Sequence, residues 1–248
     1  RLRGISSGGN LGGQEFASKL LAGIPSDAFA AFDFLGSGVS DQLKELQSNP
    51  QFGEAAKGLE KEYGVTLDEL VSLLDGEVAF YARPGALIPE FTLALQPGNP
   101  ASALVTLDKL IRHLAAEAGK TVQTGTEDGR LVRTVDFGGY AIHYTLADGK
   151  LLLTTGVKGI SEFGSGGSLT DSADFKEAQD AAGMPDSTGG LIYVDLKDAL
   201  PLLEGLAGLS GQNLGSSTTE NLRPLRSLLG WSSSAGETRT FEAFLEIQ

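Results

Sequence analysis

Asp33 and Asp195 are the two residues whose type and position best suit chemistry. Asp33 lies near the end of the apolar run 28–34, which follows Ile24-Pro25-Ser26-Asp27, and Asp195 lies near the end of the run in 184–196, which also opens on a Pro and an acid. Two such carboxylates can act as general acid and base or bind a cation. Aspartate is equally suited to starting a helix or a turn. We favour the capping interpretation and keep both residues as candidate ligand-binding positions.

The remaining residue types offer little for catalysis. The chain has no Cys, which excludes thiol catalysis and Cys-ligated metals. Its two histidines are His113, expected half-exposed on a helix, and His143, expected to face solvent from a strand. Two histidines without Cys cannot build the common His-rich metal sites, and no acidic loop has the spacing of a calcium site. We therefore expect no catalytic centre, no metal site and no cofactor.

The charge balance limits the partners. The chain carries 32 acidic and 19 basic residues, for a formal net charge of -13. Such a surface repels phosphate backbones, so nucleic acid is not an expected partner. No stretch of 18 uncharged apolar residues is present to cross a membrane. The chain opens at Arg1 rather than Met, and we expect a signal or membrane anchor to precede it, with the membrane reached only through that anchor.

Periodicity and turn residues predict an α+β fold. The clearest helix is 99–118, where Asn99-Pro100 forms a start signal and Leu104, Leu107, Ile111 and Leu114 share one face. Thr66-Leu67-Asp68-Glu69 has the pattern of a capping box. The expected strands span 28–34, 77–82, 91–95, 121–126, 130–137, 140–146, 151–155, 190–196, 231–235 and 241–247. The further expected helices span 51–62, 171–182 and 222–229, with others starting at Ser40 and Asp198.

The order of these elements indicates an internal duplication. Leu70-Val71-Ser72-Leu73-Leu74 parallels Leu225-Arg226-Ser227-Leu228-Leu229, and each precedes an expected strand. We predict that 24–96 and 184–248 are related strand–helix–hairpin halves, joined by a β-meander. Residues 1–23 have the Gly/Ser composition of a linker-like leader. The predicted architecture is thus one α+β domain over 24–248, an antiparallel sheet with helices packed on one side.

Several phrases resemble a bacterial family of secreted or membrane-anchored envelope proteins that is classed only as a domain of unknown function. They are Ser168-Leu169-Thr170-Asp171-Ser172-Ala173-Asp174-Phe175, Met184-Pro185, Tyr193-Val194-Asp195-Leu196, Ile24-Pro25-Ser26-Asp27 and Gly149-Lys150-Leu151-Leu152-Leu153. The resemblance covers about 24–248 and implies an extracytoplasmic location behind an N-terminal anchor. It supplies no site residue, because the matching phrases are structural.

The leading functional hypothesis is a non-enzymatic extracytoplasmic domain that binds a partner, an envelope component or an apolar ligand. One alternative is a hydrolase with an unrecognised carboxylate-based site. Another is a lipid carrier that holds its ligand between the sheet and the amphipathic helices. A cleft with perturbed carboxyl groups would favour the enzyme, a large dry pocket the carrier, and an exposed apolar surface the interaction module.

Overall fold

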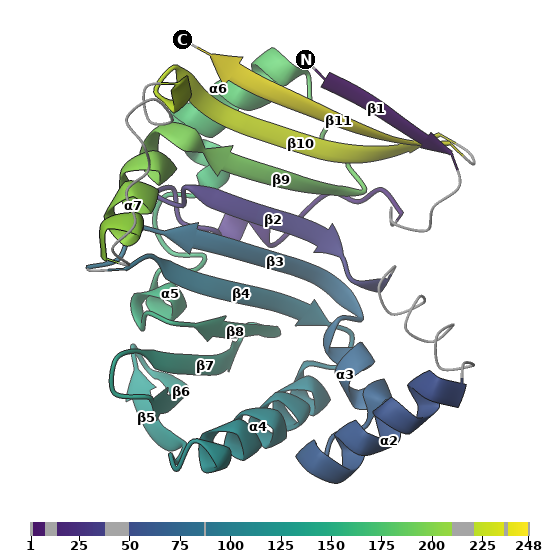
Figure 1. Ribbon diagram of the computed structural model, residues 1–248, viewed down its shortest axis with the longest axis vertical. Coiled ribbons are helices and arrows are strands. Elements are labelled where there is room, and N and C mark those ends of the chain that lie inside the picture. The colour runs from purple at the N-terminus through teal and green to yellow at the C-terminus, as the bar shows by residue number, and fades with distance from the viewer. Residues whose placement is uncertain are drawn as a thin grey trace. The chain divides into compact units, whose positions relative to one another are not determined.

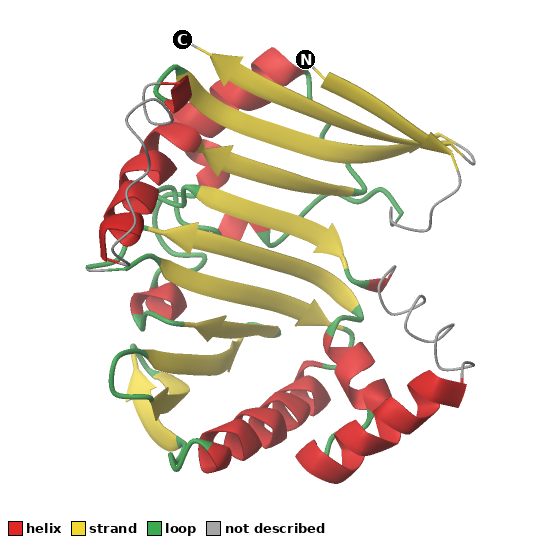
Figure 2. Ribbon diagram, in the orientation of Figure 1, coloured by secondary structure: helices red, strands yellow, loops and turns green. Residues whose placement is uncertain are grey.

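The computed structural model describes residues 2–7, 14–37, 50–86, 88–209, 221–235 and 238–247. Their strands form one large antiparallel sheet in the order β1-β11-β10-β9-β2-β3-β4-β8-β7-β6-β5, accompanied by helices, so the predicted α+β class is confirmed (Figures 1 and 2). The chain divides into two compact units. The first comprises 1–34, 80–91 and 163–248, and the second comprises 35–79 and 92–162.

Four neighbouring strands organise the first unit: β2 (Ala30–Leu35), β9 (Gly190–Asp195), β10 (Leu225–Ala235) and β11 (Thr238–Ile247). Alternating burial along β9 shows that its two faces differ, with Leu191, Tyr193 and Asp195 buried and the residues between them half-buried. Helix α6 (Ala173–Ala182) packs on the buried face, where Phe175 meets the Tyr193 ring edge-on at 5.0 Å. Figure 1 shows α6 behind these strands.

Helix α7 (Leu196–Leu209) follows β9 without a loop and contacts β10 and β9. Its start precedes Asp198, the residue expected to cap it. Pro201 lies inside the helix. Because the helix begins at Leu196, Pro201 is its sixth residue and lies past the first turn, so α7 lacks one i→i−4 hydrogen bond there. Two 3-10 turns complete the unit, η1 (Leu21–Gly23) and η2 (Leu169–Asp171), and they contact each other.

The predicted meander forms the second unit's sheet. Its strands are β5 (Gln123–Glu127), β6 (Arg130–Asp136), β7 (Ala141–Ala147) and β8 (Lys150–Thr154), each paired with the next, and β8 pairs with β4 (Glu90–Pro97). The turns at Asp128-Gly129 and Asp148-Gly149 have positive φ at both residues. Type I′ hairpins require this geometry, which is why Asp-Gly marked these turns in the sequence.

Helix α4 (Pro100–Glu117) is the longest described helix, as predicted, and the Asn99 side chain accepts a hydrogen bond from the Ser102 N–H at 3.1 Å. Its packing face differs from the prediction. Leu107 and Ile111 are buried, but Leu114 is 43% exposed, and the burial is shared with Ala103, Thr106 and Ala115. These five buried residues form one stripe along the helix, and Leu114 lies outside it.

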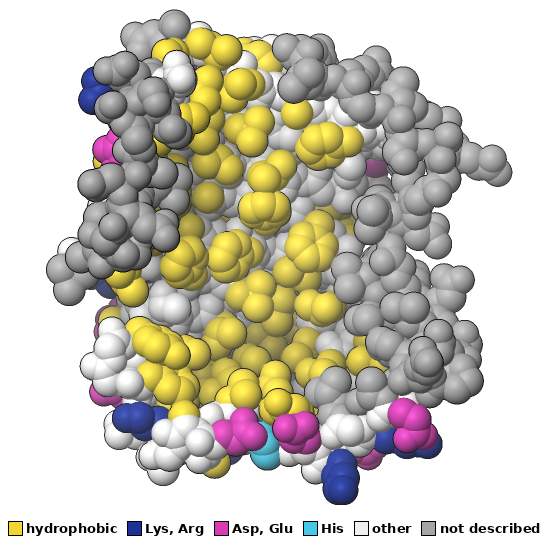
Figure 3. Space-filling view, in the orientation of Figure 1, with side chains coloured by type: hydrophobic (Ala, Val, Ile, Leu, Met, Phe, Trp, Pro, Cys, Tyr) yellow, Lys and Arg dark blue, Asp and Glu magenta, His cyan; other side chains and the backbone are white. Residues whose placement is uncertain are grey.

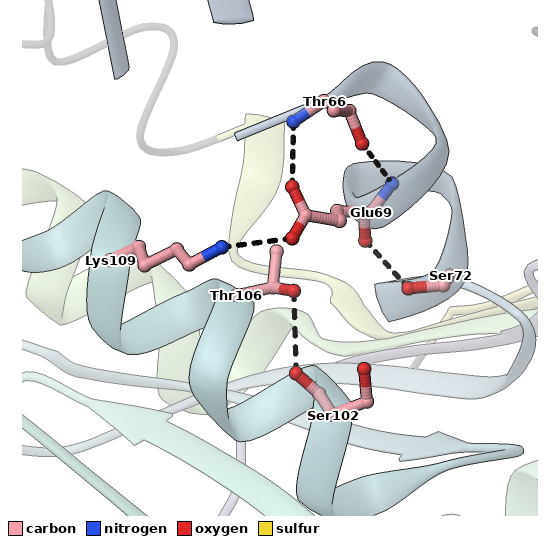
Figure 4. A network of polar contacts seen from close by, with 6 residues as sticks. All are labelled: Thr66, Glu69, Ser72, Ser102, Thr106 and Lys109. Carbon is pink, nitrogen blue, oxygen red and sulfur yellow. Dashed lines mark hydrogen bonds and ion pairs between the residues drawn. The ribbon is translucent and has the colours of Figure 1, made fainter. Parts of the chain in front are cut away.

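The capping box at the start of α3 (Leu67–Leu73) is confirmed and extends to α4 (Figure 4). Glu69 Oε2 accepts from the Thr66 N–H at 2.8 Å, and Thr66 Oγ1 accepts from the Glu69 N–H at 3.1 Å. The other carboxylate oxygen pairs with Lys109 Nζ of α4 at 3.0 Å. The pKa of Glu69 is lowered, mainly by the hydrogen bond from the Thr66 N–H and next by the hydrogen bond from Lys109. One side chain therefore starts α3 and joins it to α4.

Three further expectations differ from the structure, and a fourth cannot be compared with it. The helix expected over 222–229 is wrong, because Leu225–Ala235 is the single strand β10, whose Leu228 and Leu229 pair with both β9 and β11. The leader expected to be linker-like contains β1 (Leu2–Ser7), paired with β11. In the second unit the helices do not all pack on one side of the strands. Helix α4 contacts Tyr144, and α5 (Lys158–Ser161) lies against Thr154. The alternation of side chains places Tyr144 and Thr154 on opposite faces. The helix expected after Ser40 lies outside the described residues.

The remaining elements match their predictions closely. The segment expected as the helix 51–62 forms α2 (Pro50–Tyr63), and that expected as the strand 77–82 forms β3 (Gly76–Arg83). Of the described helices, none is both long and apolar enough to span a bilayer.

Candidate functional site

The two aspartates selected from the sequence lie on neighbouring strands but do not form a pair. Asp33 is opposite Leu191 in the β2–β9 ladder, and Asp195 is four residues further along β9. At a rise of roughly 3.4 Å per residue, the two positions are on the order of 13 Å apart along the strand. Paired carboxylates of glycosidases are at most about 9.5 Å apart. The structure therefore does not bring Asp33 and Asp195 together as an acid–base pair.

Asp195 is a helix cap. Its Oδ1 accepts a hydrogen bond from the Asp198 N–H at 3.0 Å, which satisfies a donor of the first turn of α7. The capping interpretation is thus confirmed for this residue. The side chain is only 6% exposed, and burial, followed by the charges of Asp198 and Asp174, raises the pKa of the carboxyl despite the hydrogen bonds it accepts.

Asp33 has a different role. It lies inside β2 and is 1% exposed. Leu191 and Trp231 are the directly opposite residues on the next two strands, and both are buried. Asp33 therefore lies on the buried side of these strands and does not occupy the start of a described helix, so the capping interpretation is wrong for this residue.

The two histidines lie on α4 and β7, each beside one polar side chain. His113 Nε2 lies 3.5 Å from Glu117 Oε1 on α4, and its ring contacts Tyr63 edge-on at 4.9 Å. His143 was expected to face solvent, but it is half-buried, its Nδ1 lies 3.0 Å from Thr134 Oγ1, and burial lowers its pKa. Among the described residues, no three His, Asp or Glu side chains are arranged to hold a metal ion.

A feature that the sequence analysis did not single out is the opposite face of β2, β9, β10 and β11. Register places its side chains in three rows across these strands. The rows are Ala30–Val194–Leu228–Leu245, Phe32–Ile192–Gly230–Ala243 and Phe34–Gly190–Ser232–Phe241. We call these residues the apolar face. Its only polar side chain is that of Ser232.

The apolar face is exposed although its side chains are hydrophobic. Phe32 is 44% exposed, Phe241 50% and Leu245 36%. Figure 3 views the molecule from this side and shows hydrophobic side chains gathered over β10, β9 and β2. A side chain at position 230 would clash with its neighbours on this face, because a Cβ there would lie 2.8 Å from the Phe241 ring and 3.0 Å from Ile192. The glycine therefore leaves room for the Phe241 ring and the Ile192 side chain.

Comparisons with known proteins identify no family. No protein-family model matches the chain, and no curated protein matches it. Similar solved structures include crystal form IV of TP0453, at 13% identity and a TM-score of 0.44 over 92% of this chain and 80% of that chain. Crystal form I of TP0453 is 12% identical, with a TM-score of 0.43 over 93% and 79%. Likeness at this level assigns neither a ligand nor an activity.

Proposed function

We propose that the protein is a non-enzymatic extracytoplasmic domain that binds an apolar ligand, a linear alkyl or acyl chain, on the apolar face. The observation that carries the proposal is the exposure of Phe32, Phe241 and Leu245 on one continuous, almost entirely hydrophobic surface. Monomeric proteins rarely leave contiguous apolar surface uncovered, and such patches mark binding sites.

The chemistry of the face favours an alkyl chain over a protein surface. Protein interfaces make about one hydrogen bond per 100–200 Å². The rows of the apolar face contain one hydroxyl, Ser232, and no charged side chain, so they offer almost no directional contact. An alkyl chain needs none. It gains roughly 0.8 kcal/mol for each methylene that leaves water.

The extracytoplasmic location and an N-terminal anchor are part of the proposal. Their support is the resemblance of phrases such as Tyr193-Val194-Asp195-Leu196 to the envelope family described above. An anchored domain with an apolar face would meet its ligand at the membrane it is attached to.

We also propose that 24–96 and 184–248 are related halves. The element order supports this, since β2, α2–α3 and the β3–β4 pair in one segment correspond to β9, α7 and the β10–β11 pair in the other. The test is an experimental structure of the protein. A match of the two segments, strand for strand, would support duplication, and a failure to superpose β2 on β9 together with both hairpins would refute it.

The ligand proposal is tested with non-ionic alkyl amphiphiles of 8, 10 and 12 carbons, titrated below their micelle concentrations by calorimetry. Burial of each added methylene should strengthen binding by up to about fourfold, the equivalent of 0.8 kcal/mol. Phe32→Ser should weaken binding of every chain, whereas Leu131→Ser, at a residue 53% exposed in the second unit, should not. Affinity that does not depend on chain length, or equal losses in the two variants, would refute the proposal.

A further inference from the structure

A second feature lies on the α6 side of the same four strands, away from the apolar face. It is a pocket of about 250 Å³ lined by residues of both charges. They are Asp174 and Glu177 of α6, Asp195, Lys197, Arg226, Ser227 and Glu246. Asp195 and Ser227 are directly opposite each other in the β9–β10 ladder and are 6% and 2% exposed, so the floor of the pocket is built from buried polar groups.

A β-bulge turns Arg226 into this pocket. Leu225 is opposite Ile247 and Leu228 is opposite Leu245, so β10 advances three residues where β11 advances two. Leu225 and Leu228 consequently share the side of the apolar face, and both intervening residues, Arg226 and Ser227, project to the α6 side. Regular alternation would have pointed Arg226 in the opposite direction from Ser227.

The charges that line the pocket are not paired with one another. Ser227 Oγ donates to Glu246 Oε2 at 2.8 Å, which fixes that carboxylate. Neither Arg226 nor Lys197 makes an ion pair with any other residue in the described part of the chain. The acids also crowd one another, since after burial the charges of Asp198 and Asp174 raise the pKa of Asp195. A ligand that carries charge of both signs can pair with the basic and the acidic side chains of this pocket at once.

We propose that this pocket binds a small zwitterion, a molecule with a primary ammonium group and a carboxylate. The ammonium group is held by Asp195 with Asp174 and Glu246. The carboxylate is held by the Arg226 guanidinium, which can donate two parallel hydrogen bonds to it. Lys197 lies at the pocket margin. The site goes beyond the proposed binding of alkyl chains and does not depend on it, because the two ligands use opposite faces of the strands.

The test uses 5-aminopentanoate together with its one-ended analogues, pentylamine and pentanoate, in calorimetric titrations at neutral pH and low salt. We expect 5-aminopentanoate to bind at least about tenfold more tightly than either analogue, since a charge-assisted contact contributes on the order of tenfold or more in affinity. Arg226→Gln should abolish the preference of 5-aminopentanoate over pentylamine. Asp195→Asn, which keeps a capping side chain, should reduce its preference over pentanoate.

Arg223→Gln is the matched control, because Arg223 is exposed three residues earlier in the chain and does not line the pocket. It should bind all three compounds as the unaltered protein does. Equal binding of 5-aminopentanoate and pentylamine by the unaltered protein would overturn the proposal, as would the absence of binding by all three compounds. Loss of the preference in Arg223→Gln to the same extent as in Arg226→Gln would also overturn it.

Discussion

The Tyr144 hydroxyl donates a hydrogen bond to Asp108 Oδ1 at 2.6 Å, which joins β7 to α4. Arg133 Nε lies 3.2 Å from the same oxygen, and Arg112 Nε binds Oδ2 at 2.6 Å. Burial raises the pKa of Asp108, but the hydrogen bonds from Arg112 and Tyr144 outweigh it, so that the pKa is lowered overall. One carboxylate therefore holds the helix on the strands of the second unit.

Tyr144→Phe removes only the hydroxyl of this contact. The ring is fully buried, so we expect the variant to keep its packing and lose about 1.5–3 kcal/mol of the free energy of unfolding, as for a hydrogen bond to a charged group. Urea denaturation measures this. Tyr140→Phe, at a side chain 51% exposed, is the control and should change stability by less than about 0.5 kcal/mol. Equal effects of the two substitutions would contradict the role given to Asp108.

Asp195→Asn should stabilise the protein at neutral pH and not in acid. Because the pKa of Asp195 is raised on folding, the folded state holds the proton more tightly than the unfolded state, whose carboxyl titrates near ~3.9. The stability contributed by this carboxyl is thus complete below that value and is lost as the pH rises through the folded pKa. Asparagine cannot ionise and caps a helix as well as aspartate does.

Midpoints of denaturation at pH 3 and pH 7 test the Asp195→Asn prediction. The variant should exceed the unaltered protein at pH 7 and match it at pH 3. Asp186→Asn, in the exposed loop before β9, should show no such difference. If Asp195→Asn were more stable than the unaltered protein at pH 3 but not at pH 7, the prediction would be contradicted.

Leu107→Ala tests the packing of α4. Leu107 is 6% exposed, and its truncation should cost about 2–5 kcal/mol because a cavity remains in a close-packed core. Val105→Ala, at a residue 55% exposed on the same helix, should cost little. The thermal unfolding midpoints of both variants test this prediction. An unshifted midpoint for Leu107→Ala would show that this face of α4 is not tightly packed.

Thr66→Ala tests the capping box. Loss of the Thr66 hydroxyl removes the acceptor of the Glu69 N–H, and a cap of this kind is worth about 0.5–2 kcal/mol. Thr66→Ser keeps the hydroxyl and should recover most of the loss. If serine destabilised the protein as much as alanine in urea denaturation, packing of the threonine methyl group would account for the effect instead.

Local signals predicted much of the fold. Asn99-Pro100, Thr66 with Glu69, and the Asp-Gly turns each specify a backbone conformation through their own side chains, so their elements could be placed from the sequence. The stretch 222–229 could not, because Leu225, Leu228 and Leu229 fit a helix and a strand equally well. The strand forms because this stretch pairs with β9 and β11, and such pairing between separate segments is not visible in the local sequence.

The candidate sites, too, could be predicted only as far as local sequence determines them. Asp195 was selected correctly as a capping residue and lines the pocket, but nothing in the sequence placed it opposite Ser227. The apolar face was missed because Ile192 and Val194 alternate with Leu191 and Tyr193, so β9 is hydrophobic on both sides and reads as a fully buried strand. Which side is left uncovered depends on where α6 packs, and that is a tertiary property.

The most direct test of the central proposal is to locate a bound alkyl chain. The protein would be irradiated with a fatty alcohol that carries a photoreactive diazirine at the chain end, and the modified residues identified by peptide mass spectrometry. The proposal predicts labelling on the apolar face, at Phe32, Ile192, Phe241 or Leu245, and competition by unlabelled dodecanol. Labelling confined to α6 or to the second unit, or labelling that dodecanol does not reduce, would contradict it.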